Sequence, residues 1–257
     1  APCVTTCPAT LRVQGYIQLI KVGKYEEAVR LILEELPLPG VIGRICPHPC
    51  ESACRRRELD EPVAICDLKW FAADQVDLAT LPLPKIAKKR KKGAIIGAGP
   101  AGLSCAYHLA RQGYPCTIFE ALPVTGGMIR VGVPDHRLPK EVLDREIAFI
   151  QRLGVQIRTN TALGRDITLE SLAQEGYKAV FLGLGCQLGT PLGIPGEEAA
   201  GVVQGVDLLR DLALGQNPKF GKKVLVVGGG YAAFDVARTA VRLGSEVSIL
   251  YRRSRAE

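Results

Sequence analysis

The stretch that decides the fold lies at residues 93–120 and reads GAIIGAGPAGLSCAYHLARQGYPCTIFE. A short apolar run, a glycine turn, a helical pattern and a second apolar run follow one another, which predicts a βαβ unit. The turn carries the pattern GxGxxG at Gly97, Gly99 and Gly102. In such a turn the first glycine allows the bend, the second lets a pyrophosphate approach the backbone, and the third lets helix and strand pack closely. Glu120 ends the second run, where an acid can bond a ribose hydroxyl.

The pattern recurs at residues 221–253, which read GKKVLVVGGGYAAFDVARTAVRLGSEVSILYRR. The positions that correspond to the three glycines, at an offset of about 131 residues, are Gly228, Gly230 and Ala233. Tyr251 replaces the acid and is followed by Arg252 and Arg253. A carboxylate would repel a 2′-phosphate, whereas an arginine pair binds it through charge-assisted hydrogen bonds. The second unit therefore predicts an NADP(H) site, and two different nucleotide sites suggest a flavoprotein with a pyridine nucleotide as donor.

The segment between the two units continues the alternation of strands and helices. Helical periodicity at about 140–153 and apolar runs near 155–159 and 178–183 predict one helix and two strands. Such alternation is typical of an α/β fold with a parallel sheet. We therefore expect a Rossmann-like α/β module with two dinucleotide sites, in which residues 93–200 form the FAD-binding domain and residues 201–257 begin the NADPH-binding domain.

The N-terminal region predicts helices instead. Residues 10–36 show two short helical patterns, the second of which ends at the prolines of LPLPG. A third helix is predicted at 61–76, where acidic residues precede Pro62. The stretch LPLPKIAKKRKK at 81–92 predicts an extended, charged linker. Residues 1–80 are therefore expected to form a separate helical domain.

Composition and charge limit the classes of protein. The chain has 257 residues, 47% of them hydrophobic, and no apolar run approaches the roughly 20 residues of a membrane-spanning helix. The formal charge of +7 comes partly from the basic run at 85–93, which lacks the aromatic residues of a nucleic-acid-binding segment and is typical of a solvated linker. No signal-peptide pattern opens the chain. We expect a cytoplasmic protein without a membrane span or a nucleic-acid partner, and the missing initiator Met suggests a longer parent.

Nine cysteines are many for this length, and six of them fall within the first 66 residues. The six candidate ligands are Cys3, Cys7, Cys46, Cys50, Cys54 and Cys66. The remaining three, expected to be buried as small hydrophobic side chains, are Cys105, Cys116 and Cys186. The early spacings are CxxxC and CxxxCxxxC. Three chemistries compete for these thiols: disulfides, a zinc ion and iron–sulfur clusters.

Iron–sulfur clusters fit the cysteine pattern better than the other two. Disulfides need an oxidising compartment, which a nucleotide-dependent protein without a secretion signal does not predict. Zinc sites commonly use CxxC pairs, and the sequence has none. The soft thiolates, the CP steps at Cys7 and Cys46, and the basic residues Arg44 and 55–57 suit a negatively charged cluster. We therefore expect these cysteines to bind iron.

Three stretches besides the first glycine unit carry a family resemblance: TGGMIRVGVPDHRLPK, LGIPGEE and GGGYAAFDVARTAVRLGSEVSILYRRSRAE. Together they resemble the glutamate synthase small-subunit family of FAD- and NADPH-binding iron–sulfur oxidoreductases. That family includes the N-terminal portion of dihydropyrimidine dehydrogenase and the large subunit of NADH-dependent ferredoxin:NADP oxidoreductase. The resemblance covers nearly all of the chain.

The resemblance implies one set of residues for each nucleotide. It assigns FAD to Gly97, Gly99, Pro100, Ala101, Gly102, Glu120, Gly126, Gly127, Met128 and Arg137. It assigns NADPH to Gly228, Gly230, Ala233, Arg252 and Arg253. The family carries a later Gly-Asp flavin motif that this chain does not reach, so we expect an incomplete FAD site.

For the cysteines the resemblance implies two 4Fe–4S clusters. The first would be held by a CxxC pair upstream of the chain together with Cys3 and Cys54. The second would be held by a fourth ligand together with Cys7, Cys46 and Cys50. In several relatives that fourth ligand is a Glu or Gln at the position of Lys69, and lysine is a poor cluster ligand. Cys66 lies one helical turn earlier. Two readings of Cys66, as the ligand and as a buried thiol, stay open.

The resemblance implies an NAD(P)H-dependent flavin oxidoreductase that passes electrons from NADPH through FAD and the clusters to an electron-accepting subunit or fused domain. Glutamate synthase is the expected partner. The alternative is a ferredoxin-linked or bifurcating subunit with a transhydrogenase, hydrogenase or formate dehydrogenase partner. A non-catalytic adaptor is a further alternative, against which the intact glycines of both turns argue. No catalytic residue is assigned, and His136 is interpreted as an ordinary loop histidine.

Overall fold

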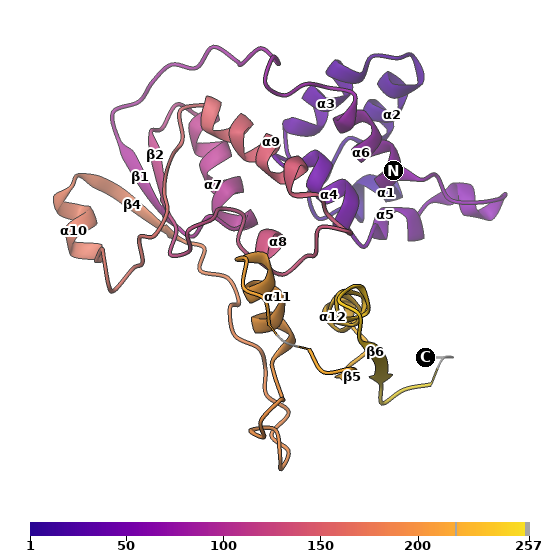
Figure 1. Cartoon of the computed structure of the whole chain (residues 1–257). Helices are drawn as coiled ribbons and strands as arrows, with labels where there is room; N and C mark the ends of the chain where they lie inside the picture. The colour runs from indigo at the N-terminus through magenta and orange to yellow at the C-terminus, as the bar shows by residue number, and fades with distance from the viewer. Residues whose placement is uncertain (219, 255–257) are drawn as a thin grey trace.

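The computed structural model describes residues 1–218 and 220–254. Figure 1 shows three parts: a group of short helices, a parallel α/β body beside it, and a smaller lobe, drawn below the body, that carries the second glycine turn. Within the described residues, no helix is both long enough and apolar enough to cross a membrane.

Short helices make up the N-terminal part. They are α1 (Pro2–Thr5), α2 (Val13–Lys21), α3 (Tyr25–Leu33), α4 (Pro39–Ile45), α5 (Pro49–Ser52), the 3₁₀ helix η1 (Arg55–Glu58) and α6 (Ile65–Asp74). The pair α2 and α3 pack together and bury Tyr16 and Ile32 almost completely. The helix predicted at 61–76 is shorter than expected and begins at Ile65. The preceding residues 61–64 contain no regular secondary structure, and Val63 helps to line a cavity.

A four-stranded parallel sheet forms the body, in the order β3-β2-β1-β4. Its elements are β1 (Lys92–Ile96), α7 (Pro100–Arg111), β2 (Cys116–Phe119), α8 (Met128–Val131), α9 (Lys140–Arg152), β3 (Gln156–Arg158), α10 (Leu169–Gln174) and β4 (Tyr177–Leu182). The predicted α/β fold is therefore confirmed. Cys186 is exposed rather than buried as expected, because the strand ends at Leu182 and Cys186 lies in the loop beyond it.

The lobe repeats the first unit. It consists of α11 (Gly205–Ala213), β5 (Lys223–Val227), α12 (Tyr231–Arg242) and β6 (Glu246–Leu250), with β5 and β6 paired in parallel. The backbone N–H of Gly97 donates to the Phe119 carbonyl at 2.7 Å. At the corresponding place, the N–H of Gly228 donates to the Leu250 carbonyl at 2.9 Å. Both glycine turns are thus tied to the end of the following strand in the same way.

The apolar core continues across the linker at 81–92. One buried cluster contains Val29 and Leu33 of α3 together with Leu103 of α7 and Ile150 of α9. Residues 81–91 of this stretch contain no helix or strand, and they lie against the body. The Lys89 N–H donates to the Gly113 carbonyl at 2.8 Å, and the Lys89 ammonium lies 4.0 Å from the centre of the Tyr114 ring. The helices and the body therefore share a core.

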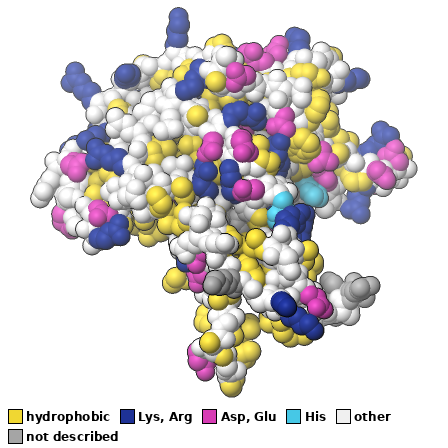
Figure 2. Space-filling view, in the orientation of Figure 1, with side chains coloured by type: hydrophobic (Ala, Val, Ile, Leu, Met, Phe, Trp, Pro, Cys, Tyr) yellow, Lys and Arg dark blue, Asp and Glu magenta, His cyan; other side chains and the backbone are white. Residues whose placement is uncertain are grey.

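Basic side chains do not gather in one place on the face shown in Figure 2. Lys and Arg are spread over that face and alternate with Asp and Glu around its middle. Hydrophobic side chains are visible on the lower lobe, where Leu225, Val227 and Leu250 are more than half exposed.

Candidate cofactor sites

Two glycines of the first turn are required by the protein itself. Gly97 has a φ of +104°, which disfavours any side chain, and a Cβ there would lie 2.3 Å from the Gly183 carbonyl oxygen. A Cβ at Gly102, in the first turn of α7, would lie 1.9 Å from the Gly97 carbonyl oxygen. These glycines let the chain turn from β1 into α7 without a clash.

Unlike Gly97 and Gly102, the middle glycine of each turn is not required by the backbone or by packing. Gly99 and Gly230 are the N-caps of α7 and α12, and their φ values of −74° and −86° suit any residue. A Cβ at Gly99 would meet no closer neighbour than the Gly127 Cα at 3.8 Å, and a Cβ at Gly230 would meet nothing within 4 Å. Since neither backbone nor packing demands glycine, the open space fits a ligand that approaches the helix N-terminus. A dinucleotide pyrophosphate binds in this way.

Glu120 lies at the carboxyl end of β2, as predicted, and is 7% exposed. Its carboxylate accepts hydrogen bonds from the backbone N–H groups of Ala98 at 2.7 Å and Leu122 at 2.9 Å. The same carboxylate therefore holds the glycine turn in place. Each carboxylate oxygen can accept a second hydrogen bond, so a ribose hydroxyl remains a possible further partner.

The loop expected to face the flavin packs on the first turn. The Gly126 N–H donates to the Ala98 carbonyl at 2.9 Å. Gly127 has a φ of +54°, and a Cβ there would lie 2.7 Å from the Gly99 Cα. Met128 begins α8 directly afterwards. Pro100 and Ala101, the other two residues assigned to FAD near this turn, form the first turn of α7. The structure thus brings these predicted FAD residues together.

Arg137 lies in a different environment from the other residues assigned to FAD. Its guanidinium forms an ion pair with Asp235 of α12 at 2.7 Å and lies 5.8 Å from the Tyr231 ring. Asp235 is 3% exposed; burial raises its pKa, and the charge of Arg137 opposes that shift. Within the described residues, the Arg137 Nε and the His136 Nε2 are buried without a hydrogen-bond partner. The structure therefore brings this loop to the lobe, a contact that the sequence did not predict.

The second turn resembles the first in geometry. Gly228 has a φ of +128°, and a Cβ there would lie 3.4 Å from the Ala233 Cβ. Ala233 fits at this position because Gly228, which it faces, has no side chain. Arg252 and Arg253 follow β6 directly and are exposed, so their guanidinium groups are accessible near the carboxyl end of that strand.

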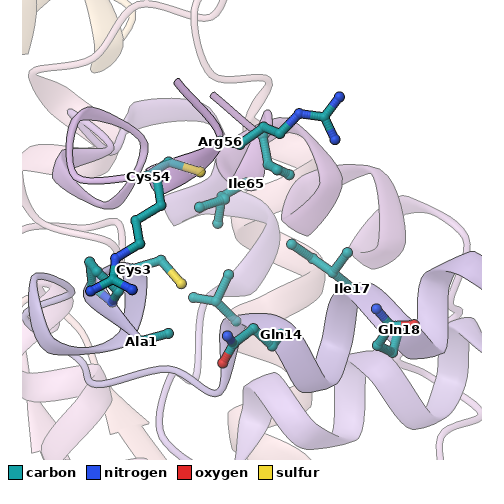
Figure 3. Close-up of a pocket in the computed structure, with 12 residues that line it drawn as sticks. Ala1, Cys3, Gln14, Ile17, Gln18, Cys54, Arg56 and Ile65 are labelled. Atoms are coloured by element: carbon teal, nitrogen blue, oxygen red, sulfur yellow. The ribbon is translucent and has the colours of Figure 1, made fainter. Parts of the chain in front are cut away.

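Two of the predicted iron ligands face one cavity. Cys3 and Cys54 line a cavity of about 360 Å³ whose other lining residues include Ala1 and Arg55. Figure 3 shows the sulfur atoms of Cys3 and Cys54 directed into this space. A water molecule takes up about 30 Å³ of liquid. The cavity therefore has room for a group much larger than a single metal ion.

The other four predicted ligands form a second group. The Cys50 thiol is affected electrostatically by Cys7 and Cys46, and the Cys66 thiol contacts Cys46. Burial raises the pKa of Cys50, and it raises the pKa of Cys66 to about 12. The Cys66 thiol also donates to the Gly43 carbonyl at 3.2 Å. These buried thiols release their protons when they bind a metal, since the thiolate is the ligand.

Tyr16 belongs to the buried cluster that contains Cys50 and against which Cys3 and Cys7 pack, and it was missed by the sequence interpretation. Its side chain is 1% exposed, and its hydroxyl donates to the Ile65 carbonyl at 3.5 Å. Burial raises the pKa of Tyr16, and thiols of both groups, including Cys50 and Cys3, raise it further. An aromatic residue at a helical spacing predicts a core position, and only the fold shows that this position is packed among cysteines.

The candidate metal ligands of the helical region are all cysteine thiols. All nine cysteines are free in the structure. Among residues 1–218 and 220–254, no three His, Cys, Asp or Glu side chains converge tightly enough for a single metal ion. Arg44, expected to lie beside the cluster, instead pairs with Asp74 at 2.5 Å and stacks on Trp70.

Comparison with known families agrees with this division. Residues 91–257 match the family described as pyridine nucleotide-disulphide oxidoreductase. The chain belongs to this family. Residues 1–80 match a second model, described as dihydropyrimidine dehydrogenase domain II, 4Fe-4S cluster. The cofactor types of the chain are therefore FAD, NADP(H) and 4Fe–4S clusters, as the sequence predicted.

Three relatives span the chain. The NADPH-Fe(3+) oxidoreductase subunit beta of Geobacter sulfurreducens is 48% identical over 100% of this chain and 39% of its own length. The NADP(+)-dependent formate dehydrogenase subunit beta of Moorella thermoacetica is 47% identical over 100% of the chain and 40% of its own length. The glutamate synthase [NADPH] small chain of Halomonas elongata is 35% identical over 98% of the chain and 56% of its own length. The chain thus spans about half or less of each relative.

A solved structure supports the fold. FprA from Mycobacterium tuberculosis in complex with NADPH has a TM-score of 0.51 and 26% identity, over 58% of this chain and 36% of that one. The chain is therefore similar in fold to an oxidoreductase whose structure contains NADPH.

Proposed function

We propose that the protein is an NADPH-dependent iron–sulfur flavoprotein subunit that delivers electrons to a partner protein. When bound, FAD would supply hydride chemistry toward NADPH and one-electron chemistry toward the 4Fe–4S clusters, which carry electrons only, so that the flavin's proton would be released to solvent. The chain's own residues bind these groups and hold them apart. The proposal includes a cytoplasmic location, since free thiols and iron–sulfur ligands suit a reducing compartment.

The main support for the proposal is that the space beside Gly99, and likewise beside Gly230, is open. Each glycine lies at a helix N-terminus where neither the backbone angle nor the packing requires it. A chain that had lost its nucleotides would have no physical reason to keep glycine at both places. This argues against the adaptor alternative.

The proposed ligands follow the sequence prediction. For FAD they are Gly97, Gly99, Pro100, Ala101, Gly102, Glu120, Gly126, Gly127 and Met128. For NADP(H) they are Gly228, Gly230, Ala233, Arg252 and Arg253. For the clusters they are Cys3 and Cys54 on one side, and Cys7, Cys46, Cys50 and Cys66 on the other. Arg137 stays a candidate for FAD, but its pairing with Asp235 favours a role between the two nucleotide-binding parts.

The sequence identities to the relatives favour a partner other than glutamate synthase. Over the aligned residues, the NADPH-Fe(3+) oxidoreductase and formate dehydrogenase subunits are 47–48% identical to this chain, against 35% for the glutamate synthase small chain. We therefore favour the alternative predicted from the sequence, an electron-transfer subunit with a partner such as a formate dehydrogenase, and the NADPH-Fe(3+) oxidoreductase relative adds a metal-reducing partner that the sequence did not suggest.

The test uses the full-length protein, purified anaerobically with FAD bound. Adding NADPH should bleach the flavin absorbance, whereas NADH at equal concentration should act far more slowly. Reduced protein should then be reoxidised by ferric citrate, and a mixture of 2-oxoglutarate and glutamine should have no effect without a glutamate synthase large subunit. A flavin that stays oxidised in excess NADPH would overturn the reductase proposal and favour the adaptor.

A further inference from the structure

Helix α4 is short, and no side chain of its own first turn caps it. The helix runs from Pro39 to Ile45, and Cys46 follows directly as its C-cap. The first N–H groups of a helix have no acceptor within the helix. Because proline has no N–H, the donors of this turn that need an outside acceptor include those of Gly40 and Val41. The placement of Cys46 therefore depends on what binds these two donors.

One carboxylate of the α/β body binds both of them. Glu146 of α9 accepts hydrogen bonds from the Gly40 N–H at 2.5 Å and from the Val41 N–H at 3.1 Å. Its side chain is 0% exposed, so water does not compete for the same donors. A Cβ at Gly40 would lie 2.9 Å from the Glu146 Oε1. Glycine at position 40 thus leaves the room that the carboxylate occupies.

The residue before Glu146 holds the neighbouring helix. Arg145 forms an ion pair at 3.2 Å with Asp74, the last residue of α6. Asp74 also pairs with Arg44 of α4 at 2.5 Å. Two adjacent residues of α9 therefore bind α4 and α6, and Asp74 joins these two helices to each other.

Helices α4 and α6 also bring two cysteines of the second group together. The Cys66 thiol of α6 donates to the Gly43 carbonyl of α4 at 3.2 Å, and Cys46 follows α4 directly. A Cβ at Gly43 would clash with the backbone of Trp70 in α6, so the two helices are in close contact. A contact that holds α4 in place therefore also holds Cys46 and Cys66.

The same face of α9 contacts the loop that precedes α8. Leu143, three residues before Glu146, is also 0% exposed, and residues three apart share one face of a helix. A Cβ at Gly126 would lie 2.7 Å from the Leu143 Cδ2. Gly126 in turn donates its N–H to the Ala98 carbonyl of the first glycine turn. Figure 1 shows α9 between α7 and α4, so this helix connects the loop proposed to face the flavin with the helix that leads to Cys46.

We infer that Glu146 is a positioning residue for electron transfer: by binding the first turn of α4, its carboxylate fixes Cys46 and Cys66 relative to the body that binds the flavin. The inference rests on the proposed function, in which the body binds FAD and these cysteines belong to a set that binds a 4Fe–4S cluster. The rate of electron transfer between two cofactors falls steeply as their separation grows. Buried hydrogen bonds to a carboxylate are strong enough to limit such movement.

Other contacts between the helical region and the body act at other places. Side chains of α7 donate to the Leu33 carbonyl at the end of α3. Arg152 of α9 donates to the Leu78 and Leu81 carbonyls, which follow α6. These contacts should keep the two regions together when the carboxylate is replaced. A change at Glu146 should therefore loosen α4 alone.

The experiment uses the full-length protein, loaded with FAD and iron and purified anaerobically. Glu146→Gln keeps the shape of the side chain and replaces one acceptor oxygen by an NH₂ group, which cannot accept. Gly40→Ala disturbs the same contact from the other side, because its methyl group approaches the carboxylate. Glu141→Gln, an exposed change on the same helix, is the matched control.

Hydrogen–deuterium exchange is measured at the amides of Gly40 and Val41. Stopped-flow absorbance follows flavin reduction by NADPH, and rapid-freeze electron paramagnetic resonance follows the later reduction of the clusters. In Glu146→Gln and Gly40→Ala we expect these amides to exchange roughly 5- to 150-fold faster, since a buried donor loses its acceptor. Cluster reduction should be several-fold slower, whereas flavin reduction, FAD content and iron content should stay at the wild-type values. The Glu141→Gln control should match the wild type throughout.

Wild-type rates of cluster reduction in both variants would overturn the inference, whether or not the amides exchange faster. Equal slowing of flavin reduction and cluster reduction would also contradict it, because the effect would then lie before the clusters. Loss of FAD or iron from both variants would show that Glu146 supports the fold of the sites rather than their placement. A wild-type protein that contains no iron, or whose flavin stays oxidised in excess NADPH, would remove the proposed function itself.

Discussion

At the scale of single residues, glycines with ordinary backbone angles are the most informative. Gly97 and Gly228 have positive φ values and are needed for the turns whether or not a ligand binds. Gly99 and Gly230 do not need to be glycine for any internal reason. Alanine at these two positions should therefore disturb binding without disturbing folding.

We expect Gly99→Ala to weaken FAD binding and Gly230→Ala to weaken NADPH binding. A methyl group in contact with a pyrophosphate should cost about 1–3 kcal/mol, which corresponds to roughly 5- to 150-fold in affinity. The FAD content after gel filtration and the apparent Kd for NADP⁺ measure the two effects. Each variant is the control of the other, because each should spare the second nucleotide. Loss of both nucleotides from either variant would mean that the substitution harms the fold.

The arginine pair after β6 carries the predicted choice of nucleotide. Replacing Arg252 and Arg253 by alanine should raise the KM for NADPH at least about 10-fold, since each hydrogen bond to a charged group contributes about 1.5–3 kcal/mol and about 1.4 kcal/mol corresponds to a factor of ten. The KM for NADH should change little, because NADH lacks the 2′-phosphate. Steady-state reduction of ferric citrate with each nucleotide measures both values. An equal rise in both KM values would show that the arginines act on the fold or on the shared pyrophosphate.

Residue-level prediction worked where chemistry is a property of the residue type. Glycines in a turn and cysteines near prolines were recognisable without any knowledge of their neighbours. The buried positions of Asp235 and Glu146 were not predicted, because each is a charged residue whose role depends on what packs around it. Arg44 shows the opposite error, since its charge is neutralised by Asp74, which is 30 positions away.

At the scale of elements, the junction between α4 and α9 depends on one buried carboxylate. Glu146 of α9 is 0% exposed, and it accepts hydrogen bonds from the backbone N–H groups of Gly40 at 2.5 Å and Val41 at 3.1 Å, at the start of α4. Burial raises the pKa of Glu146 to about 7, against the influence of these two donors. A residue of the α/β body thus caps the helix that leads to Cys46.

This junction should make stability depend on pH. The pKa of Glu146 is higher in the folded chain than the ordinary value of 4.5, so the folded state binds the proton more tightly. The resulting contribution, on the order of 3 kcal/mol, is complete below about pH 4.5 and is lost as the pH rises through about 7. Glu146→Gln should reduce the fall in Tm between pH 5 and pH 8. Glu141→Gln, an exposed change on the same helix, should leave it unchanged. An undiminished fall in Glu146→Gln would assign the pH dependence to other groups.

The extent of the elements was predictable only in part. The ranges expected for α9 and β4 agree closely with the structure, because a strong periodicity marks both. The predicted start of α6 was wrong, since residues 61–64 contain no regular secondary structure and the helix begins at Ile65. Element boundaries are the least reliable part of a prediction from sequence.

At the scale of the whole molecule, the helical region and the body are joined more firmly than the linker composition indicated. The Tyr107 hydroxyl and the Arg111 guanidinium of α7 both donate to the Leu33 carbonyl at the end of α3. Arg152 of α9 donates to the Leu78 and Leu81 carbonyls. Proline and lysine predict an extended, exposed segment, but they carry no information about the surfaces on which that segment lies. The domain boundary at 81–92 therefore stays a proposal.

The lobe is held to the body in part by the ion pair between Arg137 and Asp235. Removing one partner of a buried pair leaves an uncompensated charge and costs about 3–5 kcal/mol, whereas removing both costs much less. We therefore expect Arg137→Met to loosen the contact between the lobe and the body, and the double variant with Asp235→Asn to restore most of it. Hydrogen–deuterium exchange of α12 measures this, with faster exchange in the single variant.

The same pair should affect the reaction with NADPH, because it connects the loop next to the first glycine turn to the helix that begins at the second. In Arg137→Met the flavin should be reduced more slowly at saturating NADPH, while the FAD content stays at the wild-type value. Arg165→Met breaks an exposed pair with Asp166 elsewhere in the body and is the matched control. If Arg137→Met lost FAD but kept wild-type exchange in α12, Arg137 would be an FAD ligand, as the family resemblance implies. If it lost protection in α12 and kept FAD, its role would be to hold the two nucleotide-binding parts together.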